Sequence, residues 1–253
     1  MIASVLISLH AAVGEASAQW SISGGIEYFS WRESSAPSVT ETGPRFAAGL
    51  DWTQTKESGW LAAYRGKFYT GRVDYSGTLQ LTGAPLSGHT IYNGMVNEIQ
   101  GIYRTTGSGP SVDYVAGIGL DYWQRKLTAS QEEDYTIGFL RLGLDLNSRV
   151  KQGWLGGGGL KYSFYAYENA HLTDIGFDQN PPLRPGQNLD LYAQLGYRFN
   201  KNWGLTGYYD GYRFGKSAFV QATANRTFPG ATFSVFQPKS TMNVVGLKLQ
   251  YSF

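Results

Sequence analysis

Ten stretches of the sequence alternate apolar and polar residues, and the breaks between them alternate in length. Successive side chains of a strand point to opposite faces, so each stretch predicts a strand with one apolar and one mixed face. The predicted strands are residues 21–32, 44–52, 60–74, 91–104, 112–123, 135–146, 154–167, 188–199, 203–214 and 242–253. The longer breaks are 33–43, 75–90, 124–134, 168–187 and 215–239, and the shorter ones are 53–59, 105–110, 147–153 and 200–202. An even number of strands with all long breaks at one end predicts an up-and-down antiparallel β-barrel.

The composition excludes several classes of protein. The chain has 33 Gly, 18 Tyr, 13 Phe and 7 Trp but no Cys, which excludes a disulfide framework and any thiolate chemistry. Its formal charge of +2 leaves no electrostatic footprint for nucleic acid. Many glycines and aromatic residues, with no long apolar run after the N-terminus, favour strands and tight turns over helices.

The first 18 residues differ from the rest. Ile2–Val13 is an apolar run, and Ala16-Ser17-Ala18 follows it as a small-x-small site. This pattern predicts a cleavable signal peptide over residues 1–18, although a basic segment before the apolar run is missing. A membrane anchor is the alternative, but the run is too short to span a bilayer. The mature chain, residues 19–253, is then expected to be one domain.

The final strand ends the chain on an aromatic residue of its apolar face, which carries Val245, Leu247, Leu249, Tyr251 and Phe253. It resembles the C-terminal signature of bacterial outer-membrane β-barrels, in which a last Phe is read by the barrel-assembly machinery. An ordinary edge strand is the alternative. The resemblance implies a ten-stranded antiparallel transmembrane β-barrel in a Gram-negative outer membrane, with Tyr251 and Phe253 as the assembly signal.

The breaks and the Trp positions agree with that orientation. Short turns of such barrels are periplasmic and long loops external, so both termini are expected in the periplasm. Trp52, Trp60, Trp154 and Trp203 flank short breaks, where an interfacial aromatic belt is expected.

Three arginines of outward parity stand near the loop ends of their strands: Arg32, Arg72 and Arg213. Charge at the membrane centre costs about 2–4 kcal/mol, so these positions predict contacts with lipopolysaccharide phosphates rather than with lipid chains. An arginine reaching into a solvated loop base is an equal alternative.

The inward parity carries most of the charge. The predicted lumen network comprises Glu27, Arg45, Asp51, Arg65, Lys67, Glu98, Asp121, Arg141, Asp145, Lys161, Asp190, Arg198, Asp210 and Lys248. Acidic and basic residues balance on this face, which favours a paired, blocked lumen, whereas an ion channel would show an excess of one sign. Inward glycines such as Gly117 and Gly119 argue for open space, so a narrow porin-like channel is the alternative.

Candidate catalytic chemistry is weak. The omptin family of outer-membrane proteases is similar in strand count, and it implies an Asp pair and an Asp–His pair at the barrel mouth. Here the second loop offers Asp74, and the fourth offers His171 with Asp174 and Asp178 at a spacing that departs from the family's Asp-x-His. No catalytic residue is therefore carried over. The outer-membrane phospholipase pattern needs a His on a strand, and both His89 and His171 are expected in loops.

We therefore expect no cofactor, no metal ligands and no enzymatic activity. The expected function is a surface-binding or structural role for the external loops. A narrow channel is the alternative, and an omptin-like protease is the least favoured. The expected partners are outer-membrane lipids and lipopolysaccharide, the barrel-assembly machinery and an unidentified extracellular ligand or protein, without nucleic acid.

Overall fold

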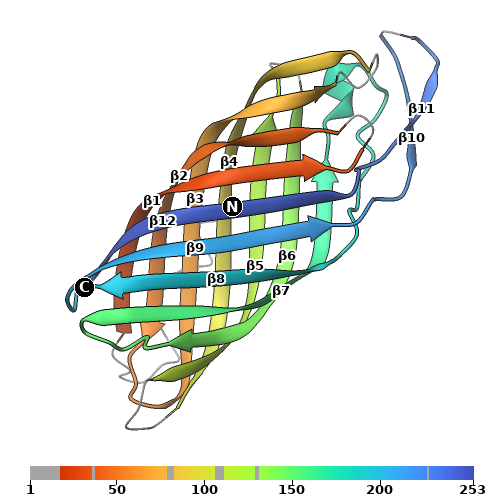
Figure 1. Cartoon of the computed structure of the whole chain (residues 1–253). Helices are drawn as coiled ribbons and strands as arrows, with labels where there is room; N and C mark the ends of the chain where they lie inside the picture. Colours follow the sequence, from red (N-terminus) through yellow and green to blue (C-terminus); the bar gives the residue numbers. More distant parts are fainter. Residues whose placement is uncertain (1–17, 36–37, 79–82, 106–110, 129–130, 227) are drawn as a thin grey trace.

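The computed structural model is a closed barrel of ten antiparallel strands (Figure 1). It describes residues 18–253 except 36–37, 79–82, 106–110, 129–130 and 227, so the predicted signal peptide lies outside the described residues apart from Ala18. The barrel strands are β1 (Ala18–Glu33), β2 (Thr40–Gln54), β3 (Gly59–Thr78), β4 (Pro85–Arg104), β5 (Val112–Lys126), β6 (Glu132–Leu146), β7 (Gly153–Asn169), β8 (Leu189–Arg198), β9 (Trp203–Phe214) and β12 (Ser240–Ser252). The predicted fold and strand number are confirmed.

The barrel closes where β12 pairs with β1. Their register runs from Ser21 opposite Ser252 to Glu33 opposite Ser240, and the Phe253 amide donates to the Trp20 carbonyl at 3.0 Å. Closure leaves no sheet edge, as a sheet that crosses a membrane requires. The short turns, the start of β1 and the end of β12 lie at one end of the barrel, which we call the turn end. We call the opposite end the loop end.

Several predicted loops are shorter than expected. The predicted break 75–90 is mostly strand, because β3 and β4 remain paired from Gly59 opposite Arg104 to Thr78 opposite Pro85. The breaks 33–43 and 124–134 likewise shrink, since β2 begins at Thr40 and β6 at Glu132. The error has a physical reason: these strand ends carry polar residues on both faces, so their alternation is hidden.

A register shift at Gly138/Phe139 interrupts the pairing of β6 with β7. Gly138 pairs with Tyr165 and Phe139 with Ser163, so Phe164 is the extra residue of a β-bulge. As a result Tyr165 is 36% exposed, although strict alternation from the inward Lys161 would point it into the lumen, whereas Ala166 and Glu168 are buried.

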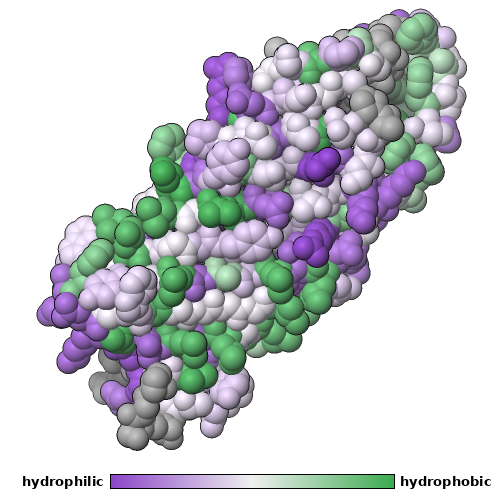
Figure 2. Space-filling model, viewed as in Figure 1, coloured by the Kyte–Doolittle hydropathy of each residue, from purple (hydrophilic) through white to green (hydrophobic). Residues whose placement is uncertain are grey.

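The outer wall of the barrel carries patches of apolar side chains, with polar residues between them and toward the ends of the barrel (Figure 2). Phe46, Leu142 and Leu195 are 67%, 61% and 61% exposed, and they represent a larger set of apolar side chains on all ten strands. Large exposed apolar surfaces of this kind need a nonaqueous neighbour, and lipid supplies it for a closed barrel. No helix among the described residues is long and apolar enough to cross a membrane.

The two longest loops fold onto each other. The first contains the 3-10 helix η2 (Leu172–Ile175), and the second contains the hairpin of β10 (Val220–Thr223) and β11 (Thr232–Val235), which stands beyond the barrel (Figure 1). Their shared core consists of Ala170, Leu172, Phe177, Leu183, Ala222 and Ala224. We call this unit the loop cap.

Candidate functional site

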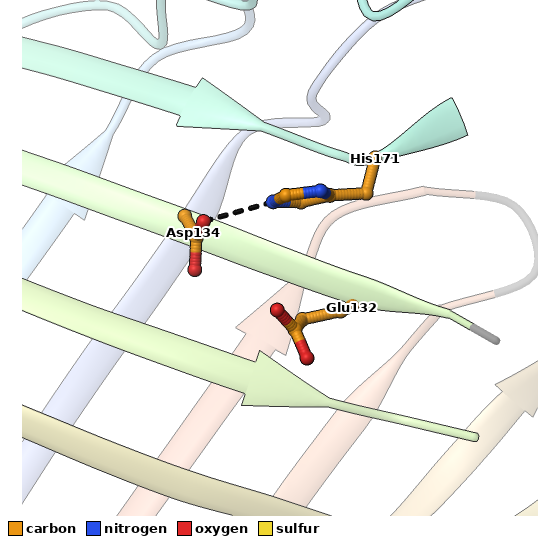
Figure 3. A group of neighbouring side chains, drawn as sticks. All are labelled: Glu132, Asp134 and His171. Atoms are coloured by element: carbon orange, nitrogen blue, oxygen red, sulfur yellow. Dashed lines mark hydrogen bonds and ion pairs between the residues drawn. The ribbon is translucent and has the colours of Figure 1, made fainter. Parts of the chain in front are cut away.

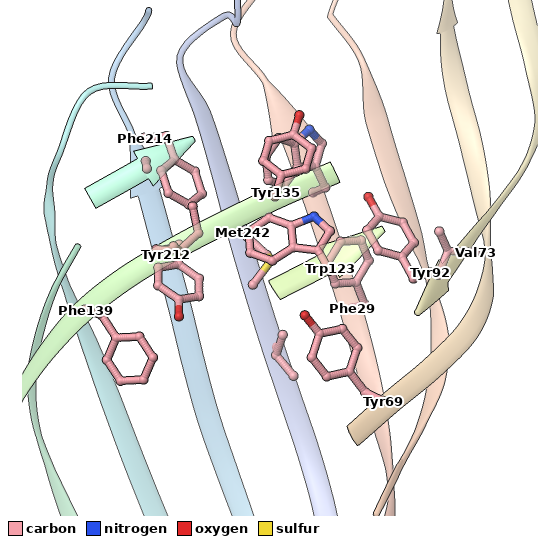
Figure 4. Close-up of a cluster of buried hydrophobic side chains, with 14 residues drawn as sticks. Phe29, Tyr69, Val73, Tyr92, Trp123, Tyr135, Phe139, Tyr212, Phe214 and Met242 are labelled. Atoms are coloured by element: carbon pink, nitrogen blue, oxygen red, sulfur yellow. The ribbon is translucent and has the colours of Figure 1, made fainter. Parts of the chain in front are cut away.

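The lumen is filled at the loop end by a packed group of inward side chains (Figure 4). This aromatic plug comprises Phe29, Trp31, Tyr69, Val73, Tyr92, Trp123, Tyr135, Ile137, Phe139, Ala166, Tyr212, Phe214, Met242 and Val244. The rings of Trp123 and Tyr135 stack at 4.9 Å between centroids, and those of Tyr212 and Phe214 at 5.6 Å. All fourteen side chains are at most 5% exposed, so they pack closely against one another and fill this half of the lumen.

Charged groups lie within the plug and on its turn-end side. The Arg45 guanidinium lies between the rings of Phe29 and Tyr69, 4.4 and 4.2 Å from their centroids, and donates to Glu27 at 2.7 Å. Glu27 also accepts from Lys67 at 2.7 Å and from the Tyr208 hydroxyl at 2.6 Å. Three donors on one buried carboxylate offset the cost of removing it from water.

A second ionic group crosses the lumen. Arg141 contacts Glu98 at 3.3 Å and Asp210 at 3.2 Å, and Lys161 also pairs with Asp210. The Lys161 ammonium lies 3.5 Å from the centroid of the Tyr212 ring, against the plug. Asp121 accepts from the Tyr69 hydroxyl at 2.9 Å.

A third ionic group at the loop end was missed by sequence reasoning. Arg125 contacts Glu133 at 3.0 Å, Glu41 at 3.1 Å and Glu33 at 3.4 Å, and all four side chains are buried. These residues fall in or beside the predicted loops 33–43 and 124–134, so the sequence did not predict that they face the lumen. The continuation of the alternation through Trp123 and Arg125 is the signal that would have found them.

The turn end of the lumen is hollow. A cavity of about 670 Å³, which we call the vestibule, extends from short-turn residues such as Lys56 and Lys201 up to Lys67 and Asp210. Small inward residues make this space: Ser21, Ser23 and Gly49 line it. Nearer the loop end of β1, the inward residues Phe29 and Trp31 carry rings instead. The predicted blocked lumen and the predicted open lumen therefore each describe one half of the molecule.

The predicted network divides accordingly. Glu27, Arg45, Lys67, Glu98, Arg141, Lys161 and Asp210 form ion pairs with one another in two groups. Asp51, Arg65, Asp145, Arg198 and Lys248 line the vestibule and make no ion pair with any described residue. Asp190 is not joined to the others either, because its nearest cation is the outward Arg213 at 3.8 Å.

The three outward arginines are exposed near the loop end. Thr241 on β12 pairs with Arg32 of β1 on one side and with Arg213 of β9 on the other. The two arginines therefore lie in one row across the wall, two strands apart. Arg72 lies on β3, opposite Ile91.

Both histidines of the part of the chain that the structure describes, His89 and His171, pair with an aspartate. His89 lies on β4 rather than in a loop, which corrects the expectation that no His is on a strand, and its Nδ1 is 2.9 Å from Asp74. His171 Nε2 lies 2.8 Å from Asp134, and Glu132 is adjacent (Figure 3). One ligand atom from each of Glu132, Asp134 and His171 falls within 4.8 Å of the others, so these residues have the chemistry to hold a metal ion. Sequence reasoning missed this group because residues 37 positions apart form it.

Comparisons with solved structures find bacterial outer-membrane barrels. The chain is similar to the outer-membrane protease OmpT of Escherichia coli (9% identity, 93% of this chain and 96% of that one, TM-score 0.49). It is also similar to the transport unit of the autotransporter AIDA-I of Escherichia coli (10%, 99% and 94%, 0.44) and to OprG of Pseudomonas aeruginosa (13%, 95% and 98%, 0.38). No protein-family model and no curated protein sequence matches the chain.

Proposed function

We propose that this outer-membrane β-barrel is a non-conducting, non-enzymatic surface protein with its turn end in the periplasm and its loop cap outside. The aromatic plug carries the proposal, because fourteen buried side chains fill the lumen between the vestibule and the loop end. Short turns on the periplasmic side and longer loops outside are the usual arrangement of such barrels.

The loop cap supports a binding role. Phe219 and Phe228 are 57% and 54% exposed, and Lys216 lies 4.0 Å from the Phe219 ring centroid and 4.1 Å from that of Phe236. Exposed aromatic rings beside a cation on a folded support are typical of protein-binding surfaces. The shared core of the two loops holds them in place at little entropic cost on binding.

Single-channel recording of the refolded protein in planar bilayers tests the proposal. We expect no conductance steps from the wild type. The double variant Trp31→Ala/Trp123→Ala removes two plug rings and is the positive control that shows inserted protein. Discrete steps from the wild type would instead establish the narrow channel, the alternative that the vestibule favours.

A loop-borne hydrolase is the remaining candidate, and the His171–Asp134 pair is the observation that favours it. A general base needs an imidazole oriented by a carboxylate, and Asp134 supplies one at 2.8 Å. Peptidase activity in the wild type that disappears in His171→Ala, but not in His89→Ala, would replace the non-enzymatic proposal.

We also propose that Arg32, Arg72 and Arg213 bind lipopolysaccharide phosphates. The exposed row formed by Arg32 and Arg213 supports this, since two cations on either side of β12 match a phosphorylated surface. The triple change of these arginines to Glu is expected to lower the lipopolysaccharide retained by the purified barrel. Unchanged retention would leave them as solvated loop-base residues.

Finally, we propose that the barrel-assembly machinery recognises Tyr251 and Phe253. Their rings stack at 6.3 Å between centroids, and Phe253 is 63% exposed at the turn end. Deletion of Phe253 is expected to reduce insertion into the outer membrane in cells while leaving detergent refolding intact. Normal insertion of the truncated chain would contradict this.

A further inference from the structure

The vestibule has an excess of positive charge. Ten basic and six acidic side chains line it, whereas the inward charges of the strands balance. The difference comes partly from the short turns, which add Lys56, Arg149, Lys151 and Lys201 to the lining but only Glu57 in return.

Ion pairing within the vestibule leaves most of that excess uncompensated. Lys67, Arg104, Arg141 and Arg149 have carboxylate partners within 4.0 Å. The remaining basic residues make no ion pair with any residue that the structure describes; they are Lys56, Arg65, Lys151, Arg198, Lys201 and Lys248. Only Asp51 and Asp145 are similarly left over on the acidic side.

Neutral groups hold two of these cations in position. Arg65 donates to the Thr53 hydroxyl at 2.7 Å and to the Trp52 carbonyl at 3.4 Å, and Arg198 donates to the carbonyls of Ser148 and Val150 at 3.4 and 3.0 Å. Such bonds fix a guanidinium without cancelling its charge, so both remain available to an anion.

The unpaired Lys248 lines the vestibule among other cations. Lys248 is within electrostatic reach of Arg65, Lys67 and Arg141, and Asp51 is the carboxylate that opposes them. A cavity lined by one sign of charge, with low-dielectric walls, focuses the field and concentrates ions of the opposite sign. Like charges gathered in this way destabilise the empty barrel and are relieved when an anion binds.

We propose that the vestibule is a binding site for a small multivalent anion that carries phosphate or carboxylate groups and enters from the turn end. Multivalency matches six uncompensated cations against two uncompensated carboxylates. The cavity volume of about 670 Å³ suits a small molecule. The aromatic plug closes the other route of entry.

Isothermal titration calorimetry on the refolded barrel in uncharged detergent micelles tests the site, with pyrophosphate and citrate as probes at low ionic strength. We expect saturable binding of at least one probe, weakened by added NaCl because of screening. The double variant Arg65→Gln/Lys248→Gln is expected to raise the dissociation constant by roughly tenfold or more. The charge-matched control Lys126→Gln/Lys239→Gln, at the loop end, is expected to bind like the wild type.

A variant that is expected to tighten binding excludes misfolding as the explanation for weaker binding. Asp51→Asn removes the carboxylate that opposes Lys248 and is expected to tighten binding, by roughly threefold. A damaged barrel would not bind more tightly. No binding of either probe, or equal loss in the vestibule and loop-end double variants, would overturn the proposal.

Discussion

The two halves of the lumen are built from the same ten strands but in opposite ways. On β1 the inward residues at the turn end are Ser21 and Ser23, and those at the loop end are Phe29 and Trp31. The first half is hollow and rich in unpaired cations, whereas the second is packed and holds Arg125 among three carboxylates. The closed strand framework thus tolerates very different interiors, and the size of the inward side chains decides which half is solid.

Removal of Arg125 is expected to have the largest effect on stability. Arg125→Leu leaves Glu33, Glu41 and Glu133 buried without their cation, which costs about 3–5 kcal/mol of unfolding free energy. Urea unfolding of the barrel in micelles measures this. The control Arg149→Leu breaks an exposed pair with Glu57 at the turn end and is expected to show no measurable change.

Loss of a plug ring comes next. Trp123→Ala removes a side chain that is 1% exposed and stacked on Tyr135, so about 3 kcal/mol of unfolding free energy is expected to disappear. Gln250→Ala in the vestibule gives up only a hydrogen bond to Ser21, worth about 1 kcal/mol or less. Equal losses at the two sites would contradict the division of the lumen into a packed and a hollow half.

Glycine replacements test how closely the plug half is packed. A Cβ at Gly119 would lie 2.3 Å from the Phe139 ring, so Gly119→Ala is expected to cost about 1–3 kcal/mol of unfolding free energy. Gly101, on the outer wall, is the control: a Cβ there meets nothing closer than 3.9 Å, so Gly101→Ala is expected to leave stability unchanged or slightly higher. Thermal unfolding of the two variants side by side measures the difference.

The smallest effect is expected at Lys248. Lys248→Met removes one of the mutually repelling cations of the vestibule, so the unfolding free energy is expected to rise by less than about 1 kcal/mol. Urea unfolding at low salt is the measurement. A clear loss of stability would mean that Lys248 has a structural partner.

Strand number and the facing of most side chains were predictable, because alternation is a local property of the chain. The turn-end boundaries were close to the predicted ones, since breakers and girdle Trp residues mark them. The loop-end boundaries of β3 and β4 were not, because above the lipid the outward face no longer has to be apolar. There Asp74 and His89 face each other on the outer wall, and the pattern looks like a loop.

The pairings inside the lumen were not predictable. Arg141 meets Asp210, which lies 69 residues away, and Glu27 meets Tyr208, 181 residues away, because the stagger of the closed barrel brings them to one level. Alternation predicts that a side chain faces the lumen, but it does not predict where along the barrel axis that side chain lies. Inward acidic and basic residues do balance over the strands, as the sequence indicated. That balance does not predict how the charges are distributed along the barrel axis.

The bulge at Phe164 makes β7 a strand with two phases. If β7 alternated regularly through Phe164, Tyr165 would point inward and Ala166 and Glu168 outward, which would place a phenol against the plug and a carboxylate on the wall. Deleting Phe164 would therefore remove the bulge but keep the facing of Tyr165, Ala166 and Glu168. Insertions or deletions in this barrel are tolerable only in pairs within a strand, or singly where a bulge already absorbs the offset.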